Sequence, residues 1–150
     1  MVTTQADTTI DGAIARRLSS RFAEVLETLV VADDVVAPDA FFDLNMPVWR
    51  FQLQGREAVE AQLRSISKGP SRVEILRTVP TASGFVQEHE EHTEVDGEDI
   101  SARRLVLCEV RDGRIVEAVV YCTGEWDDEL RARHAVEAPM LRPWSGGTER

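Results

Sequence analysis

Four strand-like segments follow one another over residues 72–126, and this run limits the possible folds more than any other feature of the sequence. The last three segments are joined at Asp96-Gly97 and at Asp112-Gly113. Asp-Gly pairs are typical of tight turns between antiparallel strands that are neighbours in a sheet. We therefore predict an antiparallel meander whose strands lie within residues 72–81, 84–95, 100–110 and 114–126.

Two amphipathic helices are expected ahead of this meander. Apolar residues recur at helical spacing over residues 11–32, behind the cap candidates Thr9 and Asp11. The link "DDVVAPDA" is rich in turn formers and has room for a short helix, and residues 41–51 are predicted to be extended. A further apolar stripe follows Gly55 in "REAVEAQLRSIS". Helices followed by a long antiparallel sheet indicate an α+β domain, with the helices packed on one face of a curved sheet.

The length of 150 residues is that of one ordinary domain. We expect a flexible N-terminus over residues 1–10, a single domain over residues 11–143 and a loose C-terminal tail over residues 144–150. No apolar run reaches the roughly 18 to 20 residues of a membrane span, and residues 1–12 lack the regions of a secretory signal. We therefore expect a cytoplasmic protein without a membrane partner.

The net charge is −10, from 27 acidic and 17 basic side chains, and it repels the phosphate backbone of nucleic acids. Nucleic acid is therefore not an expected partner. With a two-residue turn in "RDGR", Cys108 falls opposite Glu117 and Cys122 falls opposite Arg103. The two thiols are then not placed to form a disulfide within that hairpin, and free thiols suit a reducing compartment.

Asp43 and Asn45 lie two residues apart in the extended segment that opens with Phe41 and Phe42, so both side chains leave the same face. An apolar setting of this kind raises the pKa of a carboxyl group toward that of a useful general base. The alternative is that Asp43 caps a turn or is solvated at the rim of the sheet. Asn45 can hold a water or a substrate oxygen, or it can bind a neighbouring backbone group.

The segment "EHEEH" contains residue types that bind metals, but its spacing argues against a metal site. On a strand, His89 and Glu91 leave one face while Glu88, Glu90 and His92 leave the other, so at most three of the five converge. The alternative is a solvated acidic strand that faces "ARR" on the next strand. A two-residue turn would place Glu90 opposite Arg103 and His89 opposite Arg104. We expect no metal and no cofactor.

The stretch "NMP" followed by "GREAV" resembles the Asn-Met-Pro and Gly-Arg-x-Ala-Val elements of limonene-epoxide-hydrolase-like proteins. These belong to the nuclear-transport-factor-2-like superfamily, whose Asp-Gly-Lys-Ile-type hairpin is similar to "RDGRIVEAVVY". The resemblance spans about residues 11–126. It implies a cone-shaped α+β fold with a pocket between the helices and a curved sheet. The superfamily includes ketosteroid isomerases, SnoaL-like polyketide cyclases, dehydratases and non-catalytic binding modules.

The resemblance carries over only in part when it is followed residue by residue. In the hydrolases an asparagine and a tyrosine help to hold the attacking water; the asparagine corresponds to Asn45, but the tyrosine corresponds to Asp43. In ketosteroid isomerases the same segment supplies the catalytic base. The last aspartate of the hydrolase Asp-Arg-Asp set, which is the base in SnoaL-like cyclases, falls on Val120. An ungapped match from Gly84 gives the middle pair as Glu90 and His92, whereas a match anchored on Glu88 gives His89 and Glu91.

Two-residue turns at both Asp-Gly pairs would place Glu90, His92, Arg103 and Val120 on one face, and we favour that set for the pocket. One extra residue at either turn would favour His89 and Glu91 instead. The pocket wall is also expected to include Trp49 and Cys122.

The resemblance implies a cofactor-independent enzyme that uses general acid–base chemistry on a small, mostly apolar metabolite, of the isomerase, cyclase, dehydratase or epoxide hydrolase type. We expect Asp43 to accept the proton, with Asn45 and an inward-facing histidine assisting. The alternative is a non-catalytic small-molecule-binding or dimerisation module of the same fold. A homodimer through the outer face of the sheet is expected, because the strand is apolar on both faces at Leu105, Val106, Leu107, Cys108 and Val110.

Overall fold

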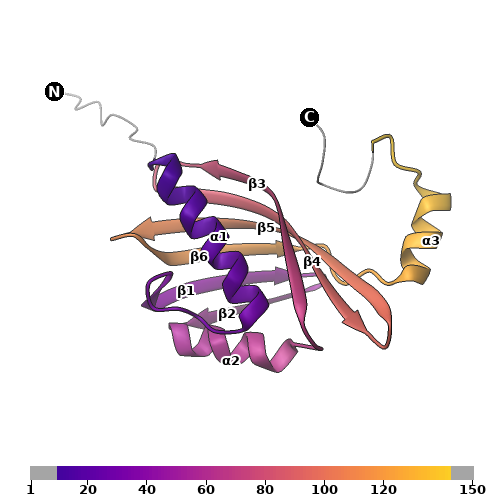
Figure 1. Cartoon of the computed structure of the whole chain (residues 1–150), viewed down its shortest axis with the longest axis horizontal. Coiled ribbons are helices and arrows are strands. Elements are labelled where there is room, and N and C mark those ends of the chain that lie inside the picture. The colour runs from indigo at the N-terminus through magenta and orange to yellow at the C-terminus, as the bar shows by residue number, and fades with distance from the viewer. Residues whose placement is uncertain (1–9, 143–150) are drawn as a thin grey trace.

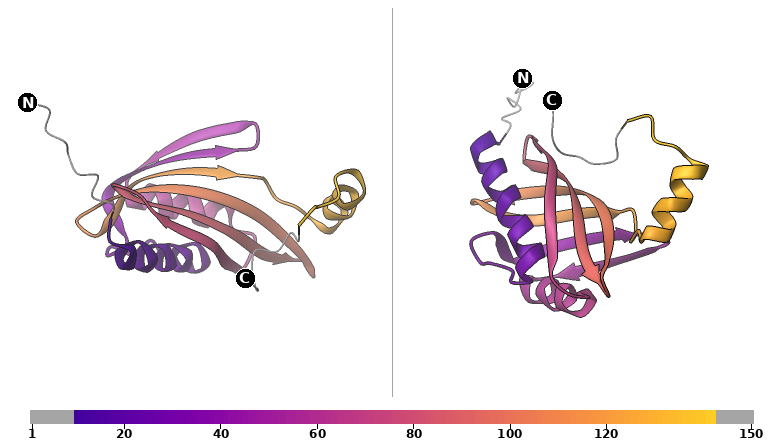
Figure 2. Two further views of the ribbon diagram at one scale, coloured as in Figure 1. Left: turned by 90° about the horizontal axis from the view of Figure 1, so that it is seen from above. Right: turned by 45° about the vertical axis from the view of Figure 1, so that its right-hand side comes forward.

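The computed structural model describes residues 10–142, which form a six-stranded sheet with two helices on one face and a third helix beyond one end (Figure 1, Figure 2). The elements in chain order are α1 (Gly12–Thr28), β1 (Val36–Met46), β2 (Trp49–Gln54), α2 (Arg56–Ile66), β3 (Ser71–Pro80), β4 (Gly84–Val95), β5 (Glu98–Arg111), β6 (Arg114–Cys122) and α3 (Asp128–Glu137). The predicted α+β architecture is confirmed.

The strand order across the sheet is β2-β1-β6-β5-β4-β3. Strands β1 and β6 run parallel, and all other neighbours run antiparallel, so the predicted meander is confirmed as β3 to β6. Both Asp-Gly pairs form two-residue turns with positive φ angles, 52° at Asp96 and 80° at Gly97, then 52° at Asp112 and 73° at Gly113. Positive φ at both central residues matches the right-handed twist of the strands that the turn connects.

A β-bulge between Glu109 and Val110 shifts the register of β5 against β6. An uninterrupted ladder from the two-residue turn would place Cys108 opposite Glu117, as the sequence predicted. The structure instead pairs Cys108 with Ala118. One extra residue in a strand changes which side chains of the neighbouring strand share its face. This shift decides which residues of β5 and β6 meet on the face that the helices cover.

Helix α1 begins after Asp11, whose Oδ1 accepts a hydrogen bond of 2.8 Å from the Ala13 N–H. It ends at Leu29, which has a left-handed φ of 60°, so the helix is shorter than the predicted 11–32. The link that follows holds a turn over residues 33–35 and no helix, because Val36 already belongs to β1. No helix of the described residues is long and apolar enough to cross a membrane.

The hydrophobic core lies between α1, α2 and one face of the sheet, called here the inner face (Figure 2). The opposite face is called the outer face. The core includes Leu18, Phe22 and Val25 of α1, Val59 of α2, and Phe85, Val106, Ile115 and Val120 of the sheet. Complete burial of a side chain of this size stabilises a fold by roughly 1.5–3 kcal/mol. The core therefore holds both helices against the inner face.

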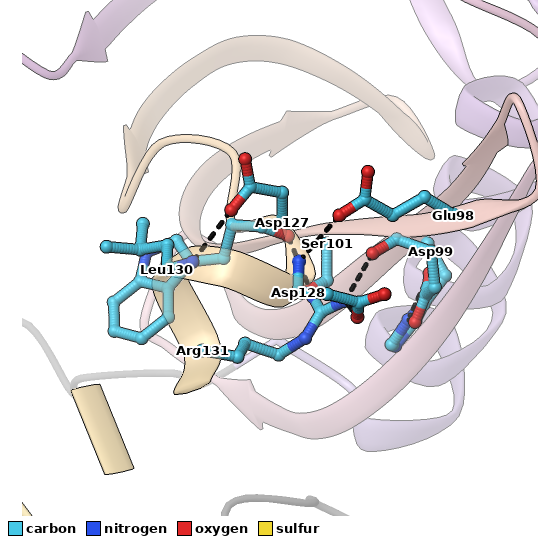
Figure 3. Close-up of polar contacts among 9 residues, drawn as sticks. Glu98, Asp99, Ser101, Asp127, Asp128, Leu130 and Arg131 are labelled. Atoms are coloured by element: carbon cyan, nitrogen blue, oxygen red, sulfur yellow. Dashed lines mark hydrogen bonds and ion pairs between the residues drawn. The ribbon is translucent and has the colours of Figure 1, made fainter. Parts of the chain in front are cut away.

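Helix α3 lies beyond the end of the sheet and has no buried residue (Figure 2). Arg131 attaches it to the sheet by hydrogen bonds to Ser101 Oγ and to the carbonyl oxygens of Trp126 and Asp99 (Figure 3). The N-terminus of the helix is capped by Asp127, whose side chain accepts a hydrogen bond from the Leu130 N–H (Figure 3). Polar contacts, and not a shared core, fix its position.

Candidate functional site

A cavity of about 350 Å³ lies between the inner face of the sheet and helices α1 and α2. Its walls are mainly apolar and include Phe22, Leu26, Phe42, Leu44, Phe51, Leu53, Val59 and Leu63. A concave, mostly apolar cavity of this volume with a few polar groups is typical of a small-molecule site.

The polar groups of the cavity lie together on two neighbouring strands. His89, Glu91 and Thr93 alternate along β4, and Arg104 lies on β5; all four line the cavity. Residues two apart on a strand point to the same face, and His89 and Arg104 are direct partners in the β4–β5 ladder. The sheet therefore places an imidazole, a carboxylate and a guanidinium at one wall of an otherwise apolar cavity.

His89 is completely buried, with 0% of its surface exposed. Neither of its ring nitrogens has a hydrogen-bond partner among the described residues. Burial, and to a smaller extent the charge of Arg104, lowers the pKa of His89 from 6.5 to about 3. The ring is therefore neutral at physiological pH, with one N–H donor and one acceptor nitrogen. Because buried polar groups normally have partners, this ring is suited to bind a polar group of a ligand.

Glu91 and Arg104 form an ion pair across the two strands. Their side chains are only 19% and 17% exposed. A guanidinium that presents its N–H groups to a carboxylate holds it in a defined orientation. The site thus offers a fixed carboxylate as a proton acceptor beside a neutral imidazole as a hydrogen-bond donor.

A second ion pair lies at the solvent-exposed edge of the cavity. Lys68 Nζ lies 2.5 Å from Glu125 Oε2, and both residues line the cavity from loops that are far apart in the sequence. Cys122 also lines the cavity, and its Sγ accepts a hydrogen bond of 3.3 Å from the Gly124 N–H. The cavity wall therefore includes one free thiol.

Asp43 and Asn45 are not at the cavity, contrary to the prediction. Asp43 lies on the outer face, where Arg50 donates hydrogen bonds of 2.9 and 2.6 Å to its carboxylate. The hydrogen bond from Arg50 is the main reason why the pKa of Asp43 is lowered, and not raised as a buried base would require. Asn45 donates through Nδ2 to the Val120 carbonyl oxygen at 3.3 Å.

The physical reason is the alternation of β1. Phe42, Leu44 and Met46 line the cavity, so the residues between them point to the outer face. Since Phe41 and Phe42 are both large and apolar, the sequence alone did not show which of them faces inward. Phe42 packs against Phe22 of α1, with ring centroids 6.3 Å apart, and this contact selects the face.

The favoured set on β4 and β5 also lies on the outer face. Arg103 donates hydrogen bonds to Glu88 at 2.8 and 3.2 Å, and His92 Nδ1 lies 3.0 and 3.2 Å from the carboxylate oxygens of Asp99. Neither they nor Glu90 line the cavity. Trp49 is 71% exposed next to the β1–β2 turn and is not a lining residue either.

The structure instead brings the alternative pair, His89 and Glu91, to the cavity together with the expected Val120 and Cys122. The bulge in the β5–β6 ladder explains this combination, because it makes Arg104 the partner of Cys122. In an uninterrupted ladder Cys122 would pair with Arg103 instead, and the two side chains would share one face of the sheet.

Sequence reasoning did not assign Arg104 or Lys68 to the site. A signal for Arg104 was present, because the two-residue turn at Asp96-Gly97 already places it opposite His89. No comparable signal existed for Lys68, which meets Glu125 only through the tertiary fold.

No family model matches the sequence, and no curated protein matches it. Solved structures do match. An NTF2-like protein from Anabaena variabilis is 19% identical with a TM-score of 0.63, and the match covers 83% of this chain and 96% of that one. A SnoaL-like polyketide cyclase from Jannaschia is 14% identical with a TM-score of 0.58, covering 85% and 94%. An LEH-like epoxide hydrolase from M. tuberculosis is 19% identical with a TM-score of 0.58, covering 73% and 78%. The chain therefore has the nuclear-transport-factor-2-like fold that the "NMP" and "GREAV" elements predicted.

Proposed function

We propose that this protein is a cofactor-independent enzyme that moves a proton on a small, mostly apolar molecule by general acid–base chemistry. The observation that carries the proposal is His89, a completely buried imidazole at the wall of an apolar cavity, beside the Glu91–Arg104 ion pair; its ring nitrogens have no hydrogen-bond partner within residues 10–142. Structures with this fold include proteins named as a ketosteroid isomerase, an epoxide hydrolase and a polyketide cyclase, which supports this class of chemistry.

Each polar group has a distinct role in the proposed reaction. Glu91, in place of Asp43, accepts the proton, either from a carbon next to a carbonyl group or from an attacking water. His89 donates a hydrogen bond from its ring N–H to the substrate oxygen on which negative charge develops. A neutral imidazole is suited to this role, because it keeps its proton while it donates the hydrogen bond. Arg104 orients the Glu91 carboxylate.

The apolar wall determines what kind of molecule enters. Aromatic and aliphatic side chains surround the three polar groups, so a ligand with an apolar body and one oxygen-bearing group is complementary to the cavity. Arg104, the cation beside His89, is already engaged by Glu91, so the site does not favour a ligand with a free negative charge.

The experiment is a ligand search followed by a turnover assay. The purified protein is incubated with a metabolite extract, and bound molecules are identified by mass spectrometry and by a ligand-bound crystal structure. We expect an apolar molecule whose oxygen lies within hydrogen-bond distance of a His89 nitrogen, and its conversion by the wild-type protein. A ligand that binds elsewhere and leaves His89 without a contact would contradict the proposal.

The second candidate is a non-catalytic module that binds the same class of molecule. The observation that favours it is Val120, an apolar residue that lines the cavity. The sequence resemblance aligns this position with the base of SnoaL-like cyclases. In this case the molecule found in the ligand search would bind and be released unchanged. Turnover of the bound molecule separates the two candidates directly.

We also infer that the protein forms a homodimer through the outer face of the sheet and resides in the cytoplasm. Leu105, Leu107 and Tyr121 are 48%, 42% and 59% exposed, and their partners in the ladders place them next to one another on that face. Exposed apolar surface of this kind is typical of an interface between protein chains. The free thiols of Cys108 and Cys122 suit a reducing compartment, which supports the cytoplasmic location.

A further inference from the structure

Three side chains with metal-binding groups converge on the outer face, on the side of the sheet opposite to the cavity. Glu74 comes from β3, and Glu90 and His92 come from β4. One ligand atom of each lies within 4.8 Å of the ligand atoms of the other two. Glu74 and Glu90 are direct partners in the β3–β4 ladder, and His92 follows two residues after Glu90 on the same face. Two rigid strands therefore hold the three groups together.

We propose that Glu74, Glu90 and His92 bind a divalent transition-metal ion, with Zn²⁺ as the best match. The proposal goes beyond the reaction in the cavity, because none of the three residues lines it.

The burial of Glu90 is the first argument for a cation. This residue is only 3% exposed, and a second carboxylate, Glu74, lies directly opposite. A buried carboxylate close to another carboxylate is costly unless positive charge is nearby. Arg72, whose Nη1 lies 3.9 Å from Glu74 Oε2, and Arg103, the ladder partner of Glu90, provide part of that charge. A divalent ion among the three ligands adds positive charge where the carboxylates are closest together.

The orientation of His92 is the second argument. Its Nδ1 lies 3.0 Å from Asp99 Oδ2 and 3.2 Å from Oδ1, so Nδ1–H donates to a carboxylate on β5. This contact selects the tautomer whose Nε2 has a free lone pair for coordination. Histidine ligands of metals almost always donate their other ring N–H to a carboxylate, a carbonyl or a water. Asp99 gives His92 this arrangement, although Asp99 is not one of the three ligands.

The donor set selects the type of metal. One imidazole and two carboxylates suit Zn²⁺ and similar borderline ions, whereas Mg²⁺ and Ca²⁺ prefer oxygen ligands only. Three protein ligands leave a fourth tetrahedral position for water. Because the ligands come from two adjacent strands, the bound ion would link β3 to β4 and stabilise this edge of the sheet.

The test uses the full, untagged chain after treatment with a chelator. Zn²⁺ binding is measured by titration calorimetry, and the thermal midpoint is measured with and without Zn²⁺. We expect one ion per chain and a higher midpoint in its presence. His92→Ala and Glu90→Gln should weaken binding at least about 10-fold, and Asp99→Asn should weaken it roughly 10- to 100-fold by releasing the imidazole. Mg²⁺ should produce no comparable effect.

Two matched controls use groups of the same kind elsewhere in the chain. Glu117→Gln changes another acidic cross-strand pair, Glu109 with Glu117, which is not part of the cluster with His92. His134→Ala removes a histidine of α3. Both variants should bind Zn²⁺ as the wild type does.

Three results of the Zn²⁺ measurements would overturn the proposal. These are no binding of Zn²⁺ at one ion per chain, binding that His92→Ala leaves unchanged, and binding that depends on His89 of the cavity instead. The wild-type protein provides a check that needs no folded variant, because Co²⁺ in a tetrahedral site with one nitrogen ligand gives visible absorption bands. An octahedral Co²⁺ spectrum identical to that of the hydrated ion would equally contradict the site.

Discussion

Arg104 lies directly opposite His89 in the β4–β5 ladder, and its charge adds to the effect of burial on the imidazole. The result is a histidine that stays neutral inside an apolar cavity. In the folded protein the pKa of His89 is about 3, against about 6.5 for an exposed histidine.

This difference predicts how the stability of the protein depends on pH. Between pH 3 and 6.5 the unfolded chain binds a proton at His89 that the folded chain does not, so the free energy of unfolding falls as the pH is lowered through this window. The expected slope from this residue is at most about 1.4 kcal/mol per pH unit. Urea unfolding of the wild type and of His89→Gln at pH 5 and pH 7 measures it.

The slope should be smaller in His89→Gln than in the wild type. A second measurement needs no variant: in NMR spectra of the folded protein, the His89 ring signals should not titrate between pH 5 and pH 8. A ring that titrates near pH 6.5 would show that the neutral state described for the cavity is not the state in solution.

The proposed proton acceptor is tested by Glu91→Gln, which keeps the shape of the side chain and removes the base. Turnover of the identified substrate should fall by roughly 10²- to 10⁴-fold, the usual effect of a positioned general base, with little change in ligand affinity. Asp43→Asn is the matched control, because Asp43 is a carboxylate in an ion pair on the outer face. Normal turnover of Glu91→Gln together with loss in Asp43→Asn would reverse the assignment.

The proposed dimer is tested by light scattering on the wild type and on Leu107→Glu. The wild type should have about twice the chain mass of 16.8 kDa, and the variant should have the monomer mass, because a charge in an apolar interface has no partner there. Leu141→Glu is the control, since Leu141 is fully exposed outside the sheet. A wild-type protein of 16.8 kDa would rule the dimer out.

A close backbone contact next to the bulge gives a prediction on stability. A Cβ atom at Gly84 would lie 1.7 Å from the carbonyl oxygen of Cys108, and neither backbone can move without breaking the β4–β5 ladder. Gly84→Ala should therefore lower the free energy of unfolding by about 1–3 kcal/mol, the usual cost of forcing extra atoms into a packed site. Gly12→Ala is the control, because the nearest atom belongs to the flexible Arg16 side chain. Chemical denaturation of both variants measures the difference.

Most of the fold was predictable because its signals are local. Each of the two Asp-Gly pairs defines a turn locally, one between β4 and β5 and one between β5 and β6. The helical spacing of the apolar residues predicts α1 and α2. The partners of His89 and Glu90 across the β4–β5 turn followed from counting outward from Asp96-Gly97. The short helix considered for the link before β1 is absent, because the link forms a turn over residues 33–35 and β1 begins at Val36.

The sequence by itself therefore determined most of the elements, their order and the two alternatives for the site, since these depend on contacts between residues close in the chain. Only the tertiary structure decided which alternative faces the cavity. The packing of Phe42 against Phe22 turned Asp43 outward, and the bulge beside Glu109 put Val120 and Cys122 on the same face as His89 and Arg104. A strand with apolar residues on both faces has two possible orientations of nearly equal hydrophobicity, and the contacts that separate them come from segments far away in the sequence.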